Sequence, residues 1–153
     1  MIPSRQNPFD APGLWLKCGI HVHSTGSDGS ATPQQAAEAY RHCGFDVLVF
    51  GDHWRVTVPA APAGLLILPG AELDVEIPGQ PAGFHFMVVG PQPEGLEQAQ
   101  ELRHQPYGLA QQLSRTCQYL ILAHPYWSAL TTELIARLDG PAALEVYNHG
   151  CEI

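Results

Sequence analysis

Basic residues are scarce in this chain of 153 residues, which holds 7 lysines and arginines against 15 aspartates and glutamates. The formal net charge is -8, and charged residues make up only 14% of the sequence, whereas an average globular protein has about one quarter. A surface that tracks extended nucleic acid needs many lysine and arginine contacts to phosphate. The composition therefore argues against extended nucleic acid as a partner.

Long hydrophobic runs are also lacking. No segment approaches the roughly 18 apolar residues that span a bilayer, and the first residues show no basic region followed by an apolar stretch. We therefore expect no membrane partner and a cytoplasmic location. The four cysteines form no C-x-x-C pair, so we expect buried, reduced thiols rather than disulfides.

Histidine, in contrast, is abundant. The 8 histidines outnumber the 7 lysines and arginines together, while the length and the 45% of hydrophobic residues suit one compact domain. The function is therefore expected to depend on the histidines.

Apolar runs alternate with helical patterns along the chain, which predicts an α/β fold with a parallel sheet or barrel. Thr32 and Gln35 form a capping-box pattern at a helix start, and Gly44 follows its end. The expected elements are an irregular lead-in (1–13), strands (14–23, 46–50, 65–68, 119–123 and 143–147), a hairpin (73–77 with 84–89) and helices (32–44, 94–116 with a break at Pro106 and Gly108, and 130–138).

Histidines and acids recur in or just beyond these strands. His21 and His23 share a face of the first strand, because strand side chains alternate. A polar loop with Asp28 follows, and the later strand regions carry Asp52, His53, Glu72, His85 and His124. In parallel α/β folds the carboxyl ends of the strands build one site, so we expect these side chains to converge.

Imidazole and carboxylate ligands suit Zn, Mn or Fe. The candidate ligands are His21, His23, Asp28, His53, Glu72, His85 and His124. They exceed the three or four ligands of one catalytic zinc, which predicts at least two cations with a bridging carboxylate. The pattern leaves open which of Glu72, Asp74 and Glu76 faces the site. His42, His104 and His149 are expected outside it.

These motifs resemble those of the polymerase and histidinol phosphatase (PHP) family of metal-dependent phosphoesterases. The resemblance rests on His21-Val22-His23 with Ser27-Asp28-Gly29, Gly51-Asp52-His53, Gly70-Ala71-Glu72, His85, Ala123-His124-Pro125 and Glu145-Val146-Tyr147-Asn148. It implies a distorted seven-stranded β/α barrel over residues 14–153 with two or three divalent metal ions.

The resemblance also implies three metal sub-sites. The first would take His21, His23 and Glu72, and the second would share Glu72 and add His85 and His124. Asp28 and His53 would form the third. Asp52 would orient His53 or a loop amide from outside the metal shell.

The sequence departs from the family pattern in its last part, since no Asp-x-His motif follows Glu145. The resemblance therefore implies a PHP domain that is incomplete at its C-terminal end and lacks its last strands. Gly51 is a smaller departure, because the family usually has threonine there.

We expect hydrolysis of a phosphate ester on a phosphorylated small molecule or short nucleotide, through a metal-bound hydroxide. Arg55 is the candidate to contact phosphate, with Lys17 as a second, although both could be solvated surface charges. Trp54, Tyr126 and Trp127 either wall the substrate pocket or simply pack. The alternatives are a non-catalytic metal-binding fragment, a nuclease and a hydrolase of amide bonds.

Overall fold

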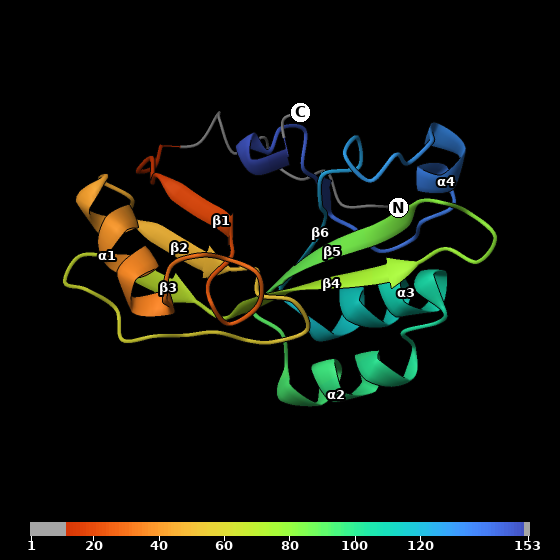
Figure 1. The fold of residues 1–153 in the computed structure, drawn as a ribbon, viewed down its shortest axis with the longest axis horizontal. Helices are drawn as coiled ribbons and strands as arrows, with labels where there is room; N and C mark the ends of the chain where they lie inside the picture. Colours follow the sequence, from red (N-terminus) through yellow and green to blue (C-terminus); the bar gives the residue numbers. More distant parts are fainter. Residues whose placement is uncertain (1–11, 152–153) are drawn as a thin grey trace.

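The computed structural model describes residues 12–151, apart from the side chain at position 93, so most of the expected lead-in (1–13) lies outside the described residues. Two sheets organise the described chain, one with three strands and one with four (Figure 1). The predicted α/β class is confirmed. The described residues form no closed sheet, and the incomplete barrel stays a prediction.

The three-stranded sheet is parallel and has the order β1-β2-β3. Its strands are β1 (Cys18–Val22), β2 (Val47–Phe50) and β3 (Leu66–Leu68), and α1 (Pro33–His42) connects the first two. All four residues of β2 are buried, as the continuous apolar run predicts. The same expectation is wrong for β3, because Leu66 at the sheet edge is 55% exposed.

Helix α1 begins and ends as its sequence predicts. The Thr32 side chain accepts a hydrogen bond from the Gln35 amide, and the Gln35 side chain accepts one from the Thr32 amide. Gly44 adopts a φ of 76° just beyond the helix, a conformation that glycine tolerates best. These signals are local, so they are readable without the rest of the fold.

The second sheet has the order β4-β5-β6-β7 and is mixed. Its strands are β4 (Gly70–Glu76), β5 (Gly83–Val89), β6 (Tyr119–Leu122) and β7 (Ala143–Leu144). The predicted β4–β5 hairpin is confirmed, but β5 and β6 are antiparallel and only β6–β7 is parallel. The expectation of one parallel sheet is therefore wrong here. An apolar run marks a buried strand without fixing the direction of its neighbour.

Helices cover one face of this mixed sheet. In Figure 1, α2 and α3 lie below the β4–β5 hairpin. The predicted helix over 94–116 is divided into α2 (Pro93–Glu101) and α3 (Pro106–Thr116), and shorter elements follow in α4 (Thr132–Ala136) and the 3₁₀ turn His149–Cys151. No described helix is long and apolar enough to cross a membrane.

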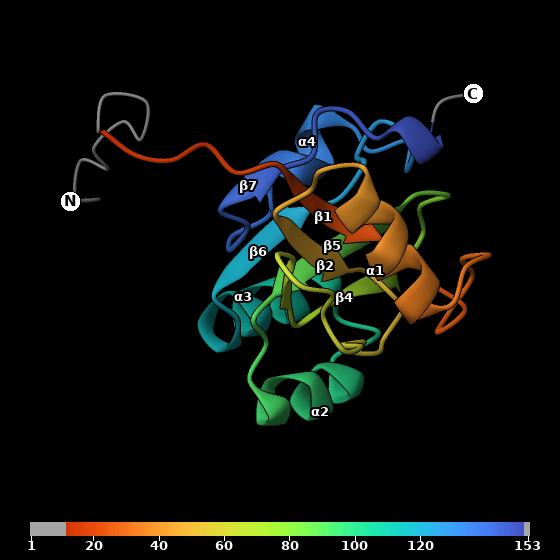
Figure 2. The same cartoon turned by 90° about the vertical axis from the view of Figure 1, so that its left-hand side faces the viewer.

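The core has three parts, and the smallest joins the two sheets. One cluster packs β4, β5 and β6 against α3, and another packs the three-stranded sheet against α1 (Figure 2). Val49 of the first sheet belongs to one apolar cluster with Met87 and Ile121 of the second sheet and with Ala123, which follows β6. The four thiols are free as predicted, but Cys18 and Cys43 are exposed, so their expected burial is wrong.

Candidate metal centre

Glu72 is the centre of the site, and its carboxylate is almost completely buried, with 1% exposed. Its Oε2 lies 3.2 Å from His21 Nε2 and 3.1 Å from His23 Nε2. Its Oε1 lies 2.9 Å from both His85 Nδ1 and His124 Nε2. Four predicted site histidines therefore converge on the carboxylate of a fifth predicted site residue, Glu72.

Strand alternation explains why these side chains face the site. In β5, Phe84 and Phe86 enter the core beside α3, so His85 between them points to the opposite face. In β4, Leu73 and Val75 likewise enter that core and leave Glu72 on the site face. His85 is half-buried there, and its Nδ1 lies 2.9 Å from Glu72 Oε1.

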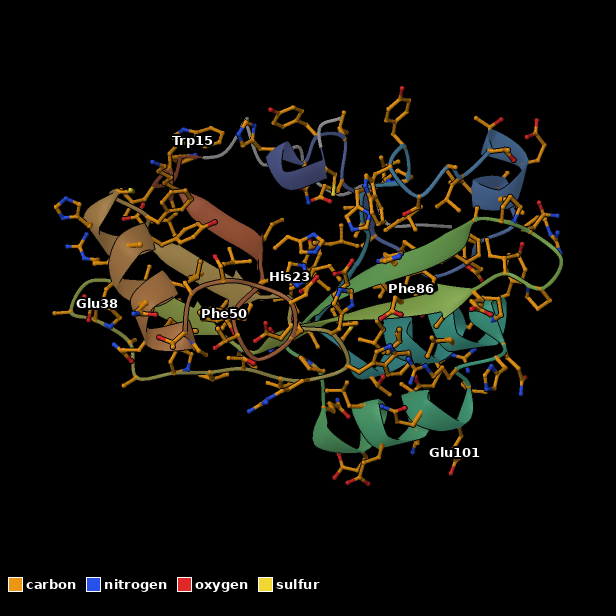
Figure 3. The ribbon with its side chains drawn as sticks, in the orientation of Figure 1. Trp15, His23, Glu38, Phe50, Phe86 and Glu101 are labelled. Atoms are coloured by element: carbon orange, nitrogen blue, oxygen red, sulfur yellow. The ribbon has the colours of Figure 1, made fainter. Side chains whose placement is uncertain are left out.

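His21 and His23 reach Glu72 from the other sheet. Their rings lie 5.1 Å apart, on the opposite side of β1 from the buried Val22, so the predicted shared face is confirmed. In Figure 3, His23 lies between Phe50 of β2 and Phe86 of β5, which belong to different sheets. The site thus lies between the two sheets.

His53 joins the same cluster through an extension of β2. It forms an isolated bridge with Glu72, and its Nε2 lies 3.5 Å from Glu72 Oε2. Asp28 Oδ2 is 3.8 Å from the same nitrogen, whereas Asp28 Oδ1 is 3.0 Å from His23 Nδ1. Asp28 is thus closer to His23 than to its expected partner His53, and its side chain is 66% exposed.

Two groups of described residues offer ligand atoms close enough to hold a cation. One is His21, Glu72 and His124, and the other is His23, His53 and Glu72; within each group the ligand atoms lie within 4.8 Å of one another. These groups divide the predicted ligands differently from the three expected sub-sites. Glu72 is common to both, as expected of a bridging carboxylate.

Carboxylates and a hydroxyl hold the outer ring nitrogens of the histidines. Asp74 Oδ1 is 2.9 Å from His53 Nδ1, and Ser128 Oγ is 3.2 Å from His124 Nδ1. Glu145 lies 3.3 Å from His21 Nδ1 and accepts a hydrogen bond from the His124 amide. Partners of this kind fix the ring orientation of metal-binding histidines.

No sequence pattern by itself assigned a role in this site to Asp74, Glu145 or Ser128. Glu145 was visible only as part of the Glu145-Val146-Tyr147-Asn148 motif. Ser128 carries no pattern of its own, because its contact with His124 arises from a turn in which the Ser128 amide donates to the His124 carbonyl. Asp74 lies two residues after Glu72, so strand alternation places it on the same face and makes it a candidate. The same alternation applies to Glu76, so the sequence could not tell the two apart.

Asp52 lies behind the cluster and binds the loop after β1. Its buried carboxylate accepts hydrogen bonds from the Ser24 amide at 2.7 Å, the Ser24 hydroxyl at 2.6 Å and the Thr57 hydroxyl at 2.5 Å. Burial would raise the pKa of Asp52, but these hydrogen bonds outweigh it and lower the pKa. This geometry fits the predicted contact with a loop amide.

Arg55 has an exposed side chain, and it is not among the described residues that line the central cleft. Its predicted phosphate contact stays a prediction. The guanidinium of Arg103, which no sequence motif marks, lies 4.7 Å from the centre of the Trp54 ring.

Opposing effects set the charge of the cluster. Burial would raise the pKa of Glu72, but its close contacts with His124, His21, His23 and His85 hold the pKa far below its usual value. Burial likewise would lower the pKa of His21, yet Glu145 and Glu72 raise it to about 9. Glu72 is therefore a buried anion in contact with four imidazoles.

The donor set fits divalent cations. Among the described residues, His21 Nε2 is a buried nitrogen without a hydrogen-bond partner, although it lies 3.2 Å from Glu72 Oε2. A buried imidazole nitrogen of this kind, aimed at a carboxylate oxygen, is a suitable ligand for a shared cation. The cluster opens into a cleft of about 750 Å³, which gives a substrate access.

Two of the other histidines, His42 and His104, do not line the central cleft, as predicted, whereas His149 does. His42 and His104 are exposed. His149 lines the rim of the cleft, where its Nδ1 lies 3.1 Å from the Tyr147 hydroxyl.

Comparison with known proteins supports the fold through solved structures. No family model and no curated protein matches the chain. A structure from Bifidobacterium adolescentis, of a protein assigned as a metal-dependent phosphoesterase, aligns with a TM-score of 0.56 and 16% identity, over 86% of this chain and 77% of that one. An amidohydrolase from Chromobacterium violaceum, solved with sulfate and no metal, aligns with a TM-score of 0.55 and 14% identity. The alignment covers 85% of this chain and 76% of that one.

A third structure comes from Bacteroides vulgatus and is a two-domain protein that contains a predicted PHP-like metal-dependent phosphoesterase. It aligns with a TM-score of 0.53 and 18% identity, over 79% of this chain and 40% of that one. Identities this low show a shared fold and do not by themselves transfer a reaction. The predicted resemblance to PHP-like proteins is confirmed at the level of the fold.

Proposed function

We propose that this chain, which shares the fold of PHP-like metal-dependent phosphoesterases, hydrolyses a phosphate ester with the help of divalent cations. The observation that carries the proposal is the buried Glu72 carboxylate, shared by imidazoles from both sheets. The proposal takes residues 14–153 as one PHP-type domain. The substrate would be a phosphorylated small molecule or short nucleotide, because lysine and arginine are too few for extended nucleic acid.

Two cations would share Glu72, one with His21 and His124 and the other with His23 and His53. His85 contacts Glu72, and Asp28 contacts both His23 and His53, so these two residues are candidates to complete the shells or to hold a third cation. Zinc, manganese and iron suit this donor set. When bound, such cations supply a water of lowered pKa and positive charge for the phosphoryl oxygens.

Residues around the ligands keep this arrangement in place. Asp74, Ser128 and Glu145 fix ring orientations, which prepares the nitrogens to face Glu72. Asp52 holds the loop that carries Asp28, so its role is to position ligands rather than to touch the reacting atoms. Arg55 remains the proposed contact for an outer phosphate oxygen.

Hydrolysis of an amide is the second candidate, favoured by the structural likeness to the amidohydrolase from Chromobacterium violaceum. A cluster of imidazoles and carboxylates can activate water for either reaction. A metal-binding role without catalysis is the third candidate, since the donor set can hold a cation whether or not a substrate is turned over.

The test is hydrolysis of phosphate esters and of amides by the purified chain supplied with Zn²⁺, Mn²⁺ or Fe²⁺, with the bound metal counted. We expect ester hydrolysis that a chelator abolishes and that the double variant His21→Ala/His23→Ala lacks. The matched control is His42→Ala, an exposed histidine on α1, which should retain full activity.

Undiminished ester hydrolysis in the double variant would overturn the metal assignment. Amide hydrolysis alone would favour the second candidate, and bound metal without turnover of either substrate would favour the third.

A further inference from the structure

An aromatic cleft adjoins the candidate metal centre. It has a volume of about 1100 Å³ and is lined by Tyr126, Trp127 and Tyr147, among other residues. His124 and Glu145 line both this cleft and the central one, so a molecule held at the metal centre can extend into it. The exposed fractions of Tyr126, Trp127 and Tyr147 are 94%, 49% and 64%.

Trp127 lines both clefts and contacts two candidate ligands through its ring. Its ring centre lies 5.1 Å from that of His124 and 5.7 Å from that of His85, with interplanar angles of 81° and 88°. These edge-to-face contacts fix the indole against two candidate ligands.

The backbone around Trp127 is also ordered by hydrogen bonds. The Ser128 amide donates to the His124 carbonyl at 3.1 Å, and the Leu130 amide donates to the Pro125 carbonyl at 3.0 Å. The half-exposed indole is therefore a preorganised contact surface, and binding against it costs little ordering of the protein.

The charges around the two clefts disfavour an anionic leaving group. Among the described residues that line them there is no lysine or arginine, while Asp28, Glu72 and Glu145 contribute carboxylates. A second phosphate or another anionic group in the aromatic cleft would face the Glu145 carboxylate and find no lysine or arginine in either lining. The leaving group that fits is uncharged, and the rings favour a planar one.

We propose that the aromatic cleft binds the leaving group of the substrate, and that this group is an uncharged aromatic ring. The inference rests on the proposed phosphoesterase function and narrows its substrate class to aryl or arylmethyl phosphate monoesters. Hydrolysis breaks the bond between phosphorus and the ester oxygen and transfers the hydroxyl of water to phosphorus. The remaining proton goes to the departing oxygen, so the products are inorganic phosphate and a phenol or arylmethanol.

The test measures binding of two phosphonates that cannot be hydrolysed, by calorimetry on the metal-loaded chain. Benzylphosphonate and cyclohexylmethylphosphonate carry the same charge and nearly the same bulk, but only the first has a flat π-system. We expect benzylphosphonate to bind about tenfold more tightly, which is the scale of one good aromatic contact.

Variants then test whether Trp127 causes the preference for benzylphosphonate. Trp127→Ala should bring the two dissociation constants together, whereas Trp127→Phe should keep most of the difference. The matched control is Tyr119→Ala, a half-exposed aromatic residue at the opposite end of β6, which should leave the ratio unchanged.

Equal affinities in the unmodified chain, or a preference that survives Trp127→Ala, would overturn the aromatic subsite. An aromatic preference without hydrolysis of phenyl phosphate would overturn the proposed reaction while the subsite remains. If neither phosphonate binds, the metal centre itself is wrong and both proposals fail.

Discussion

Single residues of the site differ in role although their sequence pattern is the same. Glu72, Asp74 and Glu76 alternate along β4 and point to one face. Only Glu72 is buried, and Asp74 is used to hold the outer nitrogen of His53. Their different roles follow from where each residue lies along β4 relative to the other sheet. The alternation of side chains along the strand does not encode that position.

Asp74 is predicted to act as a positioning residue. Asp74→Ala leaves His53 Nδ1 without its carboxylate partner, so the affinity for the cation bound by His23, His53 and Glu72 should fall about 10- to 100-fold. Asp74→Asn retains an acceptor oxygen and should weaken binding less. Metal titration followed by calorimetry measures both effects.

Glu76→Gln is the matched control, since Glu76 is exposed on the same face of the same strand. It removes one negative charge and should leave metal affinity nearly unchanged. Equal losses in the Asp74 and Glu76 variants would mean that charge, and not the contact with His53, is responsible.

His21 makes the stability of the metal-free chain depend on pH. Its pKa rises from 6.5 to about 9 on folding, so the protonated ring stabilises the fold fully below pH 6.5. That contribution is lost as the pH rises from 6.5 through 9, because the folded state then gives up the extra proton. Urea unfolding in the presence of a chelator should show stability falling over this window.

His21→Gln should flatten that slope, because no proton is left to lose at this position. The raised pKa of His53 acts in the same direction and would leave a residual slope. Stability that rises between pH 6.5 and 9 in the unmodified chain would contradict the prediction.

At the scale of elements, local signals were the most predictable. The capping box of Thr32 and Gln35 sets the start of α1, and alternation places His21 and His23 on one face. Strand direction was less predictable, because β6 is buried between an antiparallel and a parallel neighbour and its apolar run fits either. The last strand is also shorter than expected, with β7 ending at Leu144 and Glu145 free to turn toward His21.

Backbone strain at two ligand-bearing segments was not predictable either. Trp54, directly after His53, has a φ of 54°, and His124 itself has a φ of 22°. Residues with side chains rarely adopt such values, and tertiary contacts must hold them. The Trp54 amide donates to the Glu72 carbonyl, which ties this strained segment to β4.

At the scale of the molecule, the candidate ligands bridge the two sheets. His21, His23 and His53 come from the β1–β2 side, and they meet Glu72 of β4. Apart from this cluster, the apolar contact between the sheets rests on Val49 and its few neighbours. A cation at this junction binds the folded chain and not the separated sheets, so it should stabilise the whole fold.

Metal binding is therefore predicted to raise the melting temperature. A cation at 100 times its dissociation constant adds about 2.7 kcal/mol, which in a domain of this size corresponds to a rise of about 5–10 °C. Differential scanning calorimetry with Zn²⁺ or Mn²⁺, and again with excess chelator, measures the shift. The double variant His21→Ala/His23→Ala should show none, and a rise of equal size in that variant would place the cation elsewhere.

The sequence by itself determined which side chains are available and how each lies on its own strand or helix. Histidine excess, alternation on β1 and the capping of α1 depend on neighbours within a few residues, and such short-range order follows from local geometry. It also predicted that Glu72, five histidines and Asp28 would meet. Only the tertiary structure decided how they meet: His21 with His124, His23 with His53, and Glu72 shared between them. The reason is that the packing of two sheets, one parallel and one mixed, sets these distances, and that packing joins residues as far apart as Glu72 and His124.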